Sequence, residues 1–312
     1  MTRAVAFAYH NVGVRCLKVL LAQGIDVPLV VTHADDPGES QWFGSVAATA
    51  ADYGIPTIFP PDPNVADVTA RIAALAPDFL FSFYYRRLLG PSLLAIPPQG
   101  ALNMHGSLLP KFRGRAPVNW AVLAGERETG ATLHYMTIKA DDGDIVAQTA
   151  VPILPDDTAQ EVFHKVTVAA EMTLSDVLPA LLAGTAPRVP QNTASGSYFG
   201  GRRPEDGIID WSHDAAAIHN LVRAVAPPYP GALTAINGVA ARILRTRVAD
   251  AGAMRRNTPI LEVDRERIVA RCGGGGALEV LALEIDGAIV APEALAARFG
   301  SASLRLGAES VT

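Results

Sequence analysis

The chain has 312 residues, of which 49% are hydrophobic and 18% charged, with a formal net charge of −5. This composition excludes a disordered chain, and the length allows one large or two modest domains. The acidic balance argues against indiscriminate nucleic-acid binding. Cys16 and Cys272 lack disulfide or metal-ligand spacing, so we expect both to be buried small hydrophobes and expect no metal site. No secretory signal or membrane-length apolar run is evident, so we expect a cytoplasmic protein without membrane insertion.

The first part of the chain alternates short apolar runs with segments of helical periodicity. A polar loop, His33 to Glu39, follows the second of the apolar runs. Strands that alternate with helices predict an α/β fold with a doubly wound, mostly parallel sheet. The predicted strands are Ala4 to Tyr9, Val27 to Thr32, Pro56 to Phe59 and Phe79 to Phe83, and the predicted helices are Val14 to Gln23, Ser45 to Tyr53 and Val65 to Leu75.

Two polar segments follow predicted strands at their carboxyl ends, where open sheets bind ligands. The first begins with His10, which either contacts a ligand or merely forms the turn. No G-x-G-x-x-G accompanies it, so a dinucleotide site is poorly supported. The second segment, Tyr84 to Arg87, is either a ligand contact or the solvated start of a helix.

The stretch from Ala101 to Trp120 reads ALNMHGSLLPKFRGRAPVNW. On a strand, Asn103 and His105 would point to the same side. The Gly- and Pro-containing loop that follows carries a serine and three cations, which suits an anionic or carbonyl-bearing ligand. These four residues are Ser107, Lys111, Arg113 and Arg115. No G-x-S-x-G surrounds Ser107, so it is not a plausible serine nucleophile.

A helix is predicted at Val118 to Ala124 and a strand at Thr132 to Ile138, followed by the loop KADDGDI. Asp141 and Asp142 in that loop are ordinary turn formers when taken alone. Their place after the strand that follows Asn103 and His105 instead favours a functional Asp141. An amide, an imidazole and a carboxylate would also suit a hydrolase in which His105 activates water.

The second half of the chain predicts one long helix, a linker and a small β domain. The helix is Asp157 to Leu182, with a capping box formed by Thr158 and Glu161. Pro187 to Gly207 is rich in Gly, Pro, Arg and Ser. A helix at Ala215 to Val225 and short strands from Ala232 onward predict an OB-like β-barrel. We therefore predict a catalytic domain at residues 1–190, a linker at 191–207 and a C-terminal subdomain at 208–312.

Long blocks of this sequence resemble the 10-formyltetrahydrofolate-dependent formyltransferases. The blocks are VAFAYHNVG, THADDPGE, FSFYYRRLL, the Asn103–His105 stretch, KADDGDIVAQ and HNLVRAVAPPYPGA. Within the family they are most similar to the formyltransferase domain of the bifunctional UDP-4-amino-4-deoxy-L-arabinose enzyme of lipid A modification and polymyxin resistance. That enzyme has a further dehydrogenase domain, so this chain is a stand-alone enzyme, an excised domain, or an enzyme for another amino sugar.

The resemblance implies formyl transfer from 10-formyltetrahydrofolate to a primary amine. Asn103 would donate a hydrogen bond to the tetrahedral oxyanion, and His105 would shuttle a proton, because an imidazole titrates near neutrality. Asp141 would favour and orient the imidazolium. By the same resemblance, the folate would be held by Asp141 together with Arg87, Leu88, Leu89, Arg115, Thr137, Ile138, Lys139 and Ala140.

The acceptor implied by the closest resemblance is UDP-4-amino-4-deoxy-L-arabinose. The main alternative is methionyl-tRNA, which would require a basic surface on the C-terminal part. Residues 204–312 instead contain eleven arginines, no lysine and thirteen acidic residues. The R-G-R-A-P-V-N-W segment and the paired tyrosines of FSFYYRRLL also favour the sugar enzyme. Another nucleotide-linked amino sugar and a silent folate- or nucleotide-sugar-binding protein are further alternatives.

Overall fold

The computed structural model describes residues 1–34, 41–250, 258–264 and 266–307. The predicted loop from His33 to Glu39 therefore lies mostly outside the described residues. The chain forms two compact units, which we describe separately. The first comprises Met1–Pro117, Glu128–Pro152 and Phe163–Gly200, and the second comprises Val118–Arg127, Ile153–Val162 and Gly201–Thr312.

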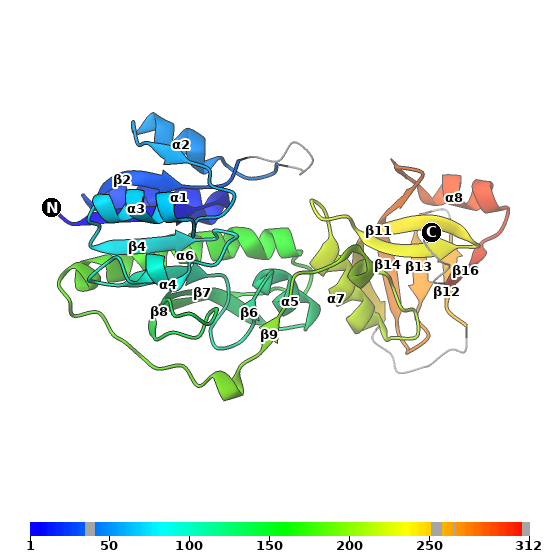
Figure 1. Ribbon diagram of the computed structural model, residues 1–312. Coiled ribbons are helices and arrows are strands. Elements are labelled where there is room, and N and C mark those ends of the chain that lie inside the picture. Colours follow the sequence, from blue (N-terminus) through cyan, green and yellow to red (C-terminus); the bar gives the residue numbers. More distant parts are fainter. Residues whose placement is uncertain (35–40, 251–257, 265, 308–312) are drawn as a thin grey trace. The chain divides into compact units, whose positions relative to one another are not determined.

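The first unit is built on a mostly parallel sheet with the strand order β3-β2-β1-β4-β5-β7-β8 (Figure 1). Strands β1 to β5 run parallel, and β7 and β8 pair antiparallel at one edge. The α/β class predicted from the alternating pattern is therefore confirmed. The strands are Arg3–Ala8 (β1), Asp26–Val31 (β2), Thr57–Ile58 (β3), Phe79–Phe83 (β4), Ala101–His105 (β5), Glu128–Tyr135 (β7) and Ile145–Pro152 (β8).

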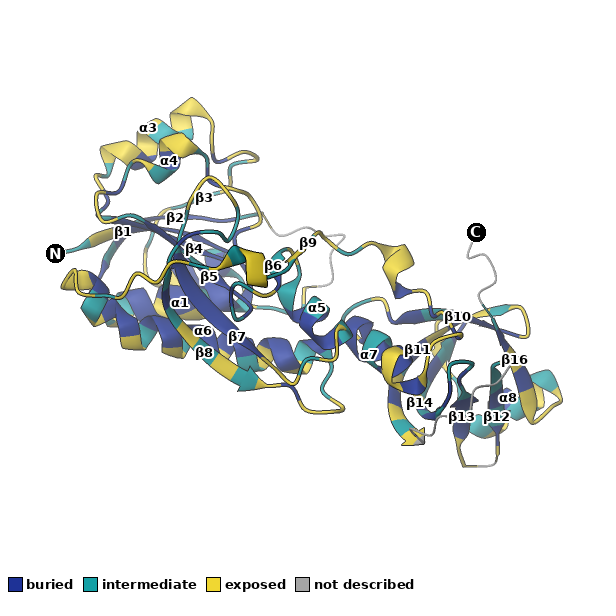
Figure 2. Cartoon of the chain, turned by 90° about the horizontal axis from the view of Figure 1, so that it is seen from below, coloured by how far each residue is buried: buried dark blue, intermediate teal, exposed yellow. Residues whose placement is uncertain are grey.

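The apolar strands are buried because helices cover both faces of the sheet, as expected for parallel strands. One face packs side chains such as Phe7 and Leu80 against Ile72 of α3 and Leu93 of α4. Figure 2 shows α1 and α6 along the opposite face, with the central strands dark blue. The helices beside the sheet are α1 (His10–Ala22), α2 (Val46–Asp52), α3 (Ala66–Ala74), α4 (Pro91–Leu94) and α6 (Ala159–Leu182).

Local sequence signals account for several element boundaries. The Ser45 hydroxyl accepts a hydrogen bond from Ala48 N and caps α2. Ahead of α6, the Thr158 amide donates to the Glu161 carboxylate at 2.7 Å, and Glu161 N donates back to Thr158 Oγ1 at 3.3 Å. The predicted capping box is thereby confirmed, although α6 begins at Ala159 rather than Asp157.

The second unit contains an antiparallel sheet that closes into a barrel. Its order is β11-β10-β16-β12-β13-β14-β15, and β11 also pairs with β14, which closes the ring. This confirms the predicted β-barrel. The elements are α5 (Pro117–Leu123), α7 (Ala215–Val225), α8 (Pro292–Phe299), β10 (Ala232–Ile236), β11 (Val239–Asp250), β12 (Ile260–Val263), β13 (Ile268–Arg271), β14 (Ala277–Ile285), β15 (Ala288–Ile289) and β16 (Ser303–Gly307).

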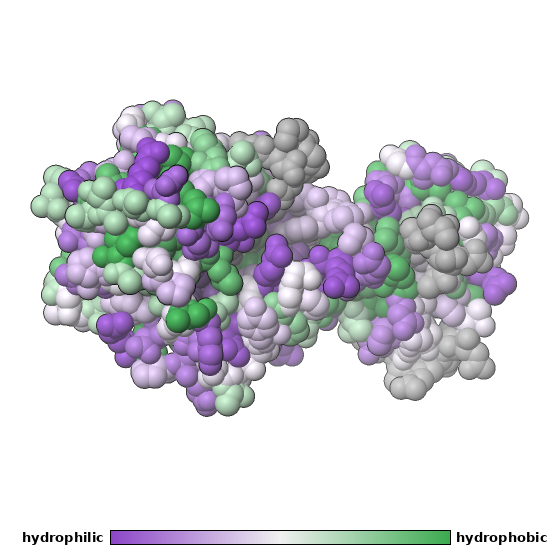
Figure 3. Space-filling model, viewed as in Figure 1, coloured by the Kyte–Doolittle hydropathy of each residue, from purple (hydrophilic) through white to green (hydrophobic). Residues whose placement is uncertain are grey.

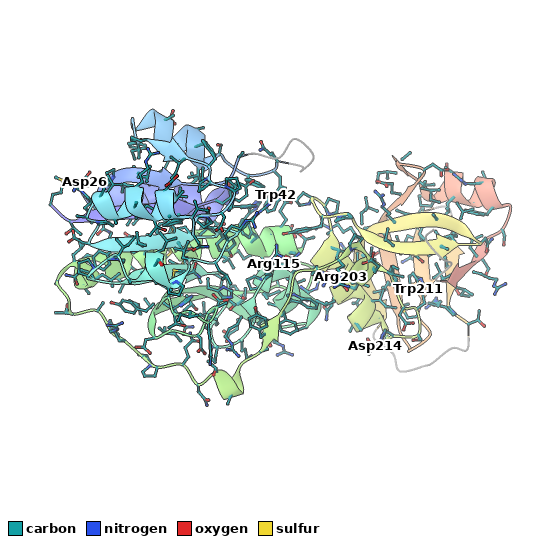
Figure 4. The ribbon with its side chains drawn as sticks, in the orientation of Figure 1. Asp26, Trp42, Arg115, Arg203, Trp211 and Asp214 are labelled. Atoms are coloured by element: carbon teal, nitrogen blue, oxygen red, sulfur yellow. The ribbon has the colours of Figure 1, made fainter. Side chains whose placement is uncertain are left out.

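The barrel core is apolar and includes a tryptophan whose indole N–H is hydrogen-bonded. Trp211 is 3% exposed, and its Nε1 donates to Thr234 Oγ1 at 2.8 Å, which removes the cost of burying that donor. Asp214 caps α7 by accepting from Ala217 N. Figure 4 labels Trp211 and Asp214 within this unit. Both predicted cysteines are free and buried, as expected.

The local structure differs from the sequence analysis in three places. The strand predicted at Thr132 to Ile138 is β7, which ends at Tyr135, so Thr137 and Ile138 lie in a loop. Strand β8 was not predicted, because its polar and small residues mask its alternation. The segment predicted as a linker contains the short elements η1 (Thr193–Ser195), β9 (Tyr198–Phe199) and η2 (Pro204–Gly207). Strand β9 pairs in parallel with β6 (Arg113–Gly114) in the first unit.

Candidate active site

The candidate site lies in the first unit, where β5 and β7 pair antiparallel. Asn103 and His105 alternate along β5 and therefore lie on one side of the strand. The register places Asn103 opposite His134 of β7 and His105 opposite Thr132. The sheet thus brings together two polar residues predicted from the sequence and one histidine that was not.

His105 is 6% exposed, and both of its ring nitrogens face oxygen atoms. Nε2 lies 2.9 Å from the carbonyl oxygen of Phe112, and Nδ1 lies 3.5 Å from Asp141 Oδ1. Because a carbonyl oxygen only accepts hydrogen bonds, Nε2 carries the hydrogen that it shares with Phe112. The exchangeable position of the ring is then Nδ1, on the side of the carboxylate.

Asp141 is held in place by backbone and histidine contacts. Its Oδ2 accepts a hydrogen bond from Gly114 N at 2.8 Å, and its Oδ1 lies 3.5 Å from His134 Nε2 as well as from His105. Its φ of 54° is in the left-handed region, which is uncommon for a residue other than glycine. Such a conformation is retained where surrounding contacts over-determine it.

The environment keeps Asp141 ionised. Burial by itself raises the pKa of this carboxyl, but the His105 charge, His134 and the Gly114 amide together hold the pKa well below its ordinary value of 3.8. Asp141 is therefore a carboxylate at neutral pH and can orient a nearby imidazole. That Asp141 is a functional residue and not only a turn former stays a prediction, and this geometry is consistent with it.

His134 is the residue that sequence reasoning missed. It is 1% exposed, its Nδ1 donates to the Tyr135 carbonyl oxygen at 2.8 Å, and its Nε2 lies 3.1 Å from Asn103 Nδ2. An amide nitrogen only donates hydrogen bonds, so in this contact Nε2 accepts from the Asn103 amide. This contact turns the amide nitrogen of Asn103, which is a donor, toward the cluster. The antiparallel register that creates the contact leaves no sequence signal.

The loop after β5 contains the remaining residues predicted around His105. Ser107 is fully buried, and its hydroxyl donates to the Lys111 carbonyl oxygen at 2.6 Å, so it shapes the loop. Arg113 faces Asp142 at 3.7 Å. Lys111 and Arg115 are exposed, and Figure 4 labels Arg115. The cations are thus split between one paired with a carboxylate and two on the surface.

The predicted folate contacts fall on two loops. Leu88 is 68% exposed beside exposed Arg87, whereas Leu89 is 4% exposed and packs into the core. Asn64 fixes this first loop by donating to the Leu88 carbonyl oxygen at 3.0 Å and accepting from Gly90 N at 2.6 Å. In the second loop Ile138 is 75% exposed, and the Thr137 hydroxyl donates to the Lys139 carbonyl oxygen. Ala140 follows, half-buried, directly before Asp141.

A separate aromatic cluster surrounds His10, which follows β1 and is the first residue of α1 and not part of the predicted turn. His10 is 9% exposed and stacks on Phe43 at 3.9 Å between ring centres. The rings of Trp42 and Phe163 meet it in T-shaped contacts, each 4.6 Å between ring centres. Burial, Arg86 and His164 lower the pKa of His10 to about 3. The neighbouring His33 stacks on Tyr85 at 4.2 Å, and burial together with Arg86 and Arg87 lowers its pKa to about 4. Both rings are neutral at physiological pH.

Within the described residues, no group of three or more His, Cys, Asp or Glu side chains is arranged to hold a metal ion. Nor does any helix in the described ranges combine the length and apolar character needed to cross a membrane. Hydrophobic and hydrophilic residues are interspersed on the visible face of the first unit (Figure 3).

Two family models match this chain, and both describe formyl transferases. Residues 20–178 match the formyl transferase model, and residues 202–300 match the model of the formyl transferase C-terminal domain. The first match alone spans half of the chain. The chain belongs to the formyl transferase family. It is therefore a formyltransferase, and the cluster of Asn103, His105, His134 and Asp141 is its candidate active site.

Solved structures of other formyltransferases share the fold of this one. The N-formyltransferase from Helicobacter canadensis, in a complex with folinic acid and dTDP-3-aminofucose, aligns with a TM-score of 0.70 at 21% identity over 90% of this chain and 99% of that chain. The sugar 3N-formyl transferase WlaRD, with dTDP and 5-N-formyl-THF, aligns with a TM-score of 0.66 at 20% identity over 89% and 96%.

A third solved structure also shares the fold. Glycinamide ribonucleotide transformylase 1 from Symbiobacterium toebii aligns with a TM-score of 0.53 at 21% identity, over 61% of this chain and 94% of that chain. At these identities the similarities establish the fold of the formyltransferase and leave its acceptor to be argued from its own residues.

Proposed function

We propose that this formyltransferase moves a formyl group from 10-formyltetrahydrofolate to the primary amine of a nucleotide-linked amino sugar. The observation that carries the proposal is the grouping of an amide, an imidazole and an ionised carboxylate around the end of β5. Asn103 and His105 come from strand β5 and Asp141 from the loop after β7, yet His105 and Asp141 approach to 3.5 Å. His134 joins Asp141 and Asn103 on the other side.

The proposed roles follow from which atoms donate and accept. The attacking amine adds to the formyl carbon, and the carbonyl oxygen becomes an oxyanion while the amine gives up a proton. The amide nitrogen of Asn103 has two hydrogens, so it can donate one to His134 and one to the oxyanion. His105 relays the proton to the departing folate nitrogen as the bond from that nitrogen to the formyl carbon breaks. Asp141 orients the imidazole throughout.

The folate would lie against the two loops that carry the exposed apolar residues Leu88 and Ile138. Exposed aliphatic side chains suit a flat ring that needs apolar contact. Arg87, Lys139 and Arg115 are exposed cations that suit the carboxylates of a folate tail. The co-substrate supplies the activated formyl group, and the loops supply orientation.

For the acceptor we propose UDP-4-amino-4-deoxy-L-arabinose. The sequence blocks shared with the arabinose enzyme support it, and the similar structures of two sugar N-formyltransferases support the wider class of nucleotide-linked amino sugars. The charge of residues 204–312, with thirteen acidic side chains against eleven arginines, is unfavourable for a tRNA acceptor. Such a reaction would belong to the cytoplasm and to lipid A modification, with residues 1–190 as the catalytic domain and residues 208–312 as the C-terminal subdomain.

A direct assay tests the proposal. The purified chain is incubated with 10-formyltetrahydrofolate and either UDP-4-amino-4-deoxy-L-arabinose, dTDP-linked 3- or 4-amino sugars, or methionyl-tRNA, and the formylated product is detected by mass spectrometry. We expect turnover of the UDP sugar and none of the tRNA. Preference for a dTDP sugar would replace the acceptor but keep the class. Formylation of the tRNA alone would overturn the proposed acceptor class.

A further inference from the structure

The segment predicted as a linker contacts both loops of the candidate site. We call residues 191–199 the strap. One end of the strap meets the loop after β7, and the other end meets the loop after β5. Through these two loops the strap acts on the Phe112 carbonyl, which contacts His105, and on the Gly114 amide, which contacts Asp141. Every contact described below lies within the first compact unit.

At the first end, Gln191 holds the loop that carries Asp141. Its Nε2 donates to the Asp141 carbonyl oxygen at 3.1 Å and to the Gly143 carbonyl oxygen at 2.6 Å. Asp141 has a positive φ, so its backbone conformation must be held by neighbours. The two hydrogen bonds from one amide group fix the turn on both sides of the Asp141–Gly143 segment.

At the second end, Ser197 holds the peptide group that faces His105. The Ser197 carbonyl oxygen accepts from Arg113 N at 3.0 Å, and its hydroxyl accepts from Phe112 N at 2.8 Å. Arg113 N belongs to the same planar peptide as the Phe112 carbonyl, which binds His105 Nε2 at 2.9 Å. This backbone bond fixes one edge of that plane, and the Ser197 hydroxyl fixes the preceding peptide through Phe112 N. Phe112 is therefore held on both sides, with its carbonyl oxygen toward the imidazole.

Strand β9 also fixes the backbone next to Gly114, whose amide binds Asp141. Arg115 N donates to the Phe199 carbonyl oxygen at 3.0 Å, and the rings of Phe112 and Phe199 stack at 5.6 Å. Gly114, between the two held positions, donates to Asp141 Oδ2. A Cβ at Gly114 would collide with the Phe199 carbonyl oxygen, so only glycine permits this close approach.

We propose that Gln191 and Ser197 of the strap are positioning residues for formyl transfer, because they fix the two loops that orient Asp141 and His105. This inference rests on the proposed function, since it concerns the same site. Neither side chain contacts the reacting atoms in this scheme. Their effect is to keep the Phe112 carbonyl and the Gly114 amide aimed at the imidazole and the carboxylate.

Single and double variants test the proposal. Ser197→Ala removes the hydroxyl acceptor, and Gln191→Leu removes the amide donor at nearly equal volume. Each should lower kcat about three- to tenfold, as expected for one hydrogen bond, and the double variant should lower it further. KM for the acceptor and for 10-formyltetrahydrofolate should stay within about twofold, because neither substrate contact is removed.

The matched controls separate positioning from general loop damage. Ser195→Ala removes a hydroxyl of the same strap that bonds only locally, to the Asn192 carbonyl oxygen, and should leave kcat unchanged. Ser197→Thr keeps the hydroxyl and should restore most of the lost activity. Equal losses in Ser195→Ala and Ser197→Ala, or wild-type kcat in the double variant, would overturn the proposal.

A measurement independent of turnover keeps the outcome separate from that of the proposed function. If the wild-type chain formylates none of the acceptors, the proposed function fails. The strap is then judged by the ¹⁵N signal of His105 Nε2 at fixed pH in the folded protein, which reports the hydrogen bond to Phe112. We expect that signal to move in Ser197→Ala and Gln191→Leu and to stay in Ser195→Ala. An unmoved signal in both strap variants would reject the positioning role.

Discussion

Two pairs of histidines lie at the same sheet, and their surroundings differ. His10 and His33 follow β1 and β2 and pack against Phe43 and Tyr85. His105 and His134 lie on β5 and β7 and share the carboxylate of Asp141 at 3.5 Å each. The first pair lies among arginines and aromatic rings, and the second pair lies beside a carboxylate.

The difference teaches that a buried histidine becomes a candidate for proton transfer only through its partners. In the aromatic cluster, burial and Arg86 lower the pKa of His10 to about 3, so that ring does not exchange a proton near neutrality. In the site, Asp141 is ionised because two histidines and the Gly114 amide lower its pKa despite burial. A charged acceptor beside an imidazole is what general acid–base chemistry requires.

The largest losses of activity are expected from substitutions in the group around His105. We expect His105→Gln and Asp141→Asn each to lower kcat by about 10²- to 10⁴-fold, the range of general acid–base catalysis, while the protein stays folded. Asn103→Ala should cost about 10²- to 10³-fold, as for one oxyanion donor. Steady-state rates with the acceptor identified by the assay above, together with circular dichroism, check these values.

A matched variant in the aromatic pair completes this test. His10→Phe keeps the ring and its packing, and its turnover should stay within about threefold of the wild type. Near-wild-type rates in Asn103→Ala, His105→Gln or Asp141→Asn would remove the assigned role from that residue. A loss in His10→Phe as large as that in His105→Gln would erase the distinction between the two pairs.

A smaller effect on turnover is expected at His134, which holds the Asn103 amide and touches no reacting atom in the proposed scheme. His134→Phe removes the acceptor at 3.1 Å and should lower kcat about three- to tenfold, the value of one hydrogen bond. His134→Gln retains an acceptor oxygen and should recover part of the loss. If His134→Phe proves as damaging as His105→Gln, His134 itself takes part in proton transfer.

The least effect on turnover, but a clear effect on acid stability, is expected at His10. A base whose pKa is lower in the folded state favours folding when neutral, so its contribution is complete above the unfolded value of 6.5 and is lost as the pH falls toward 3. Between pH 6.5 and pH 5.0 this loss is about 2 kcal/mol. Urea unfolding at pH 7.5 and pH 5.0 should therefore show a smaller drop in His10→Phe.

An exposed histidine provides the control for this measurement. The side chain of His213 in the second unit is 65% exposed, and His213→Gln should retain the acid sensitivity of the wild type. The same drop in unfolding free energy for His10→Phe and wild type would show that the aromatic cluster does not keep its histidine neutral.

The sequence by itself determined the elements whose signals are local. The apolar runs of β1 and β4, the capping box at Thr158 and Glu161, and the helix α7 follow from periodicity and from side chains within one turn of the chain. The alternation that puts Asn103 and His105 on one side of β5 is equally local. Asn103, His105 and Asp141 could be predicted for this reason, because each lies in or next to a segment whose strand or turn is evident from the local sequence.

Only the tertiary structure decided the partners of those residues. His134 meets Asn103 because of the register between β5 and β7, and a shift of one residue would turn its side chain to the other face. Gln191 reaches Asp141 across fifty residues of sequence, and Ser197 meets Phe112 across eighty-five. Such contacts depend on packing between distant segments, which no local pattern encodes.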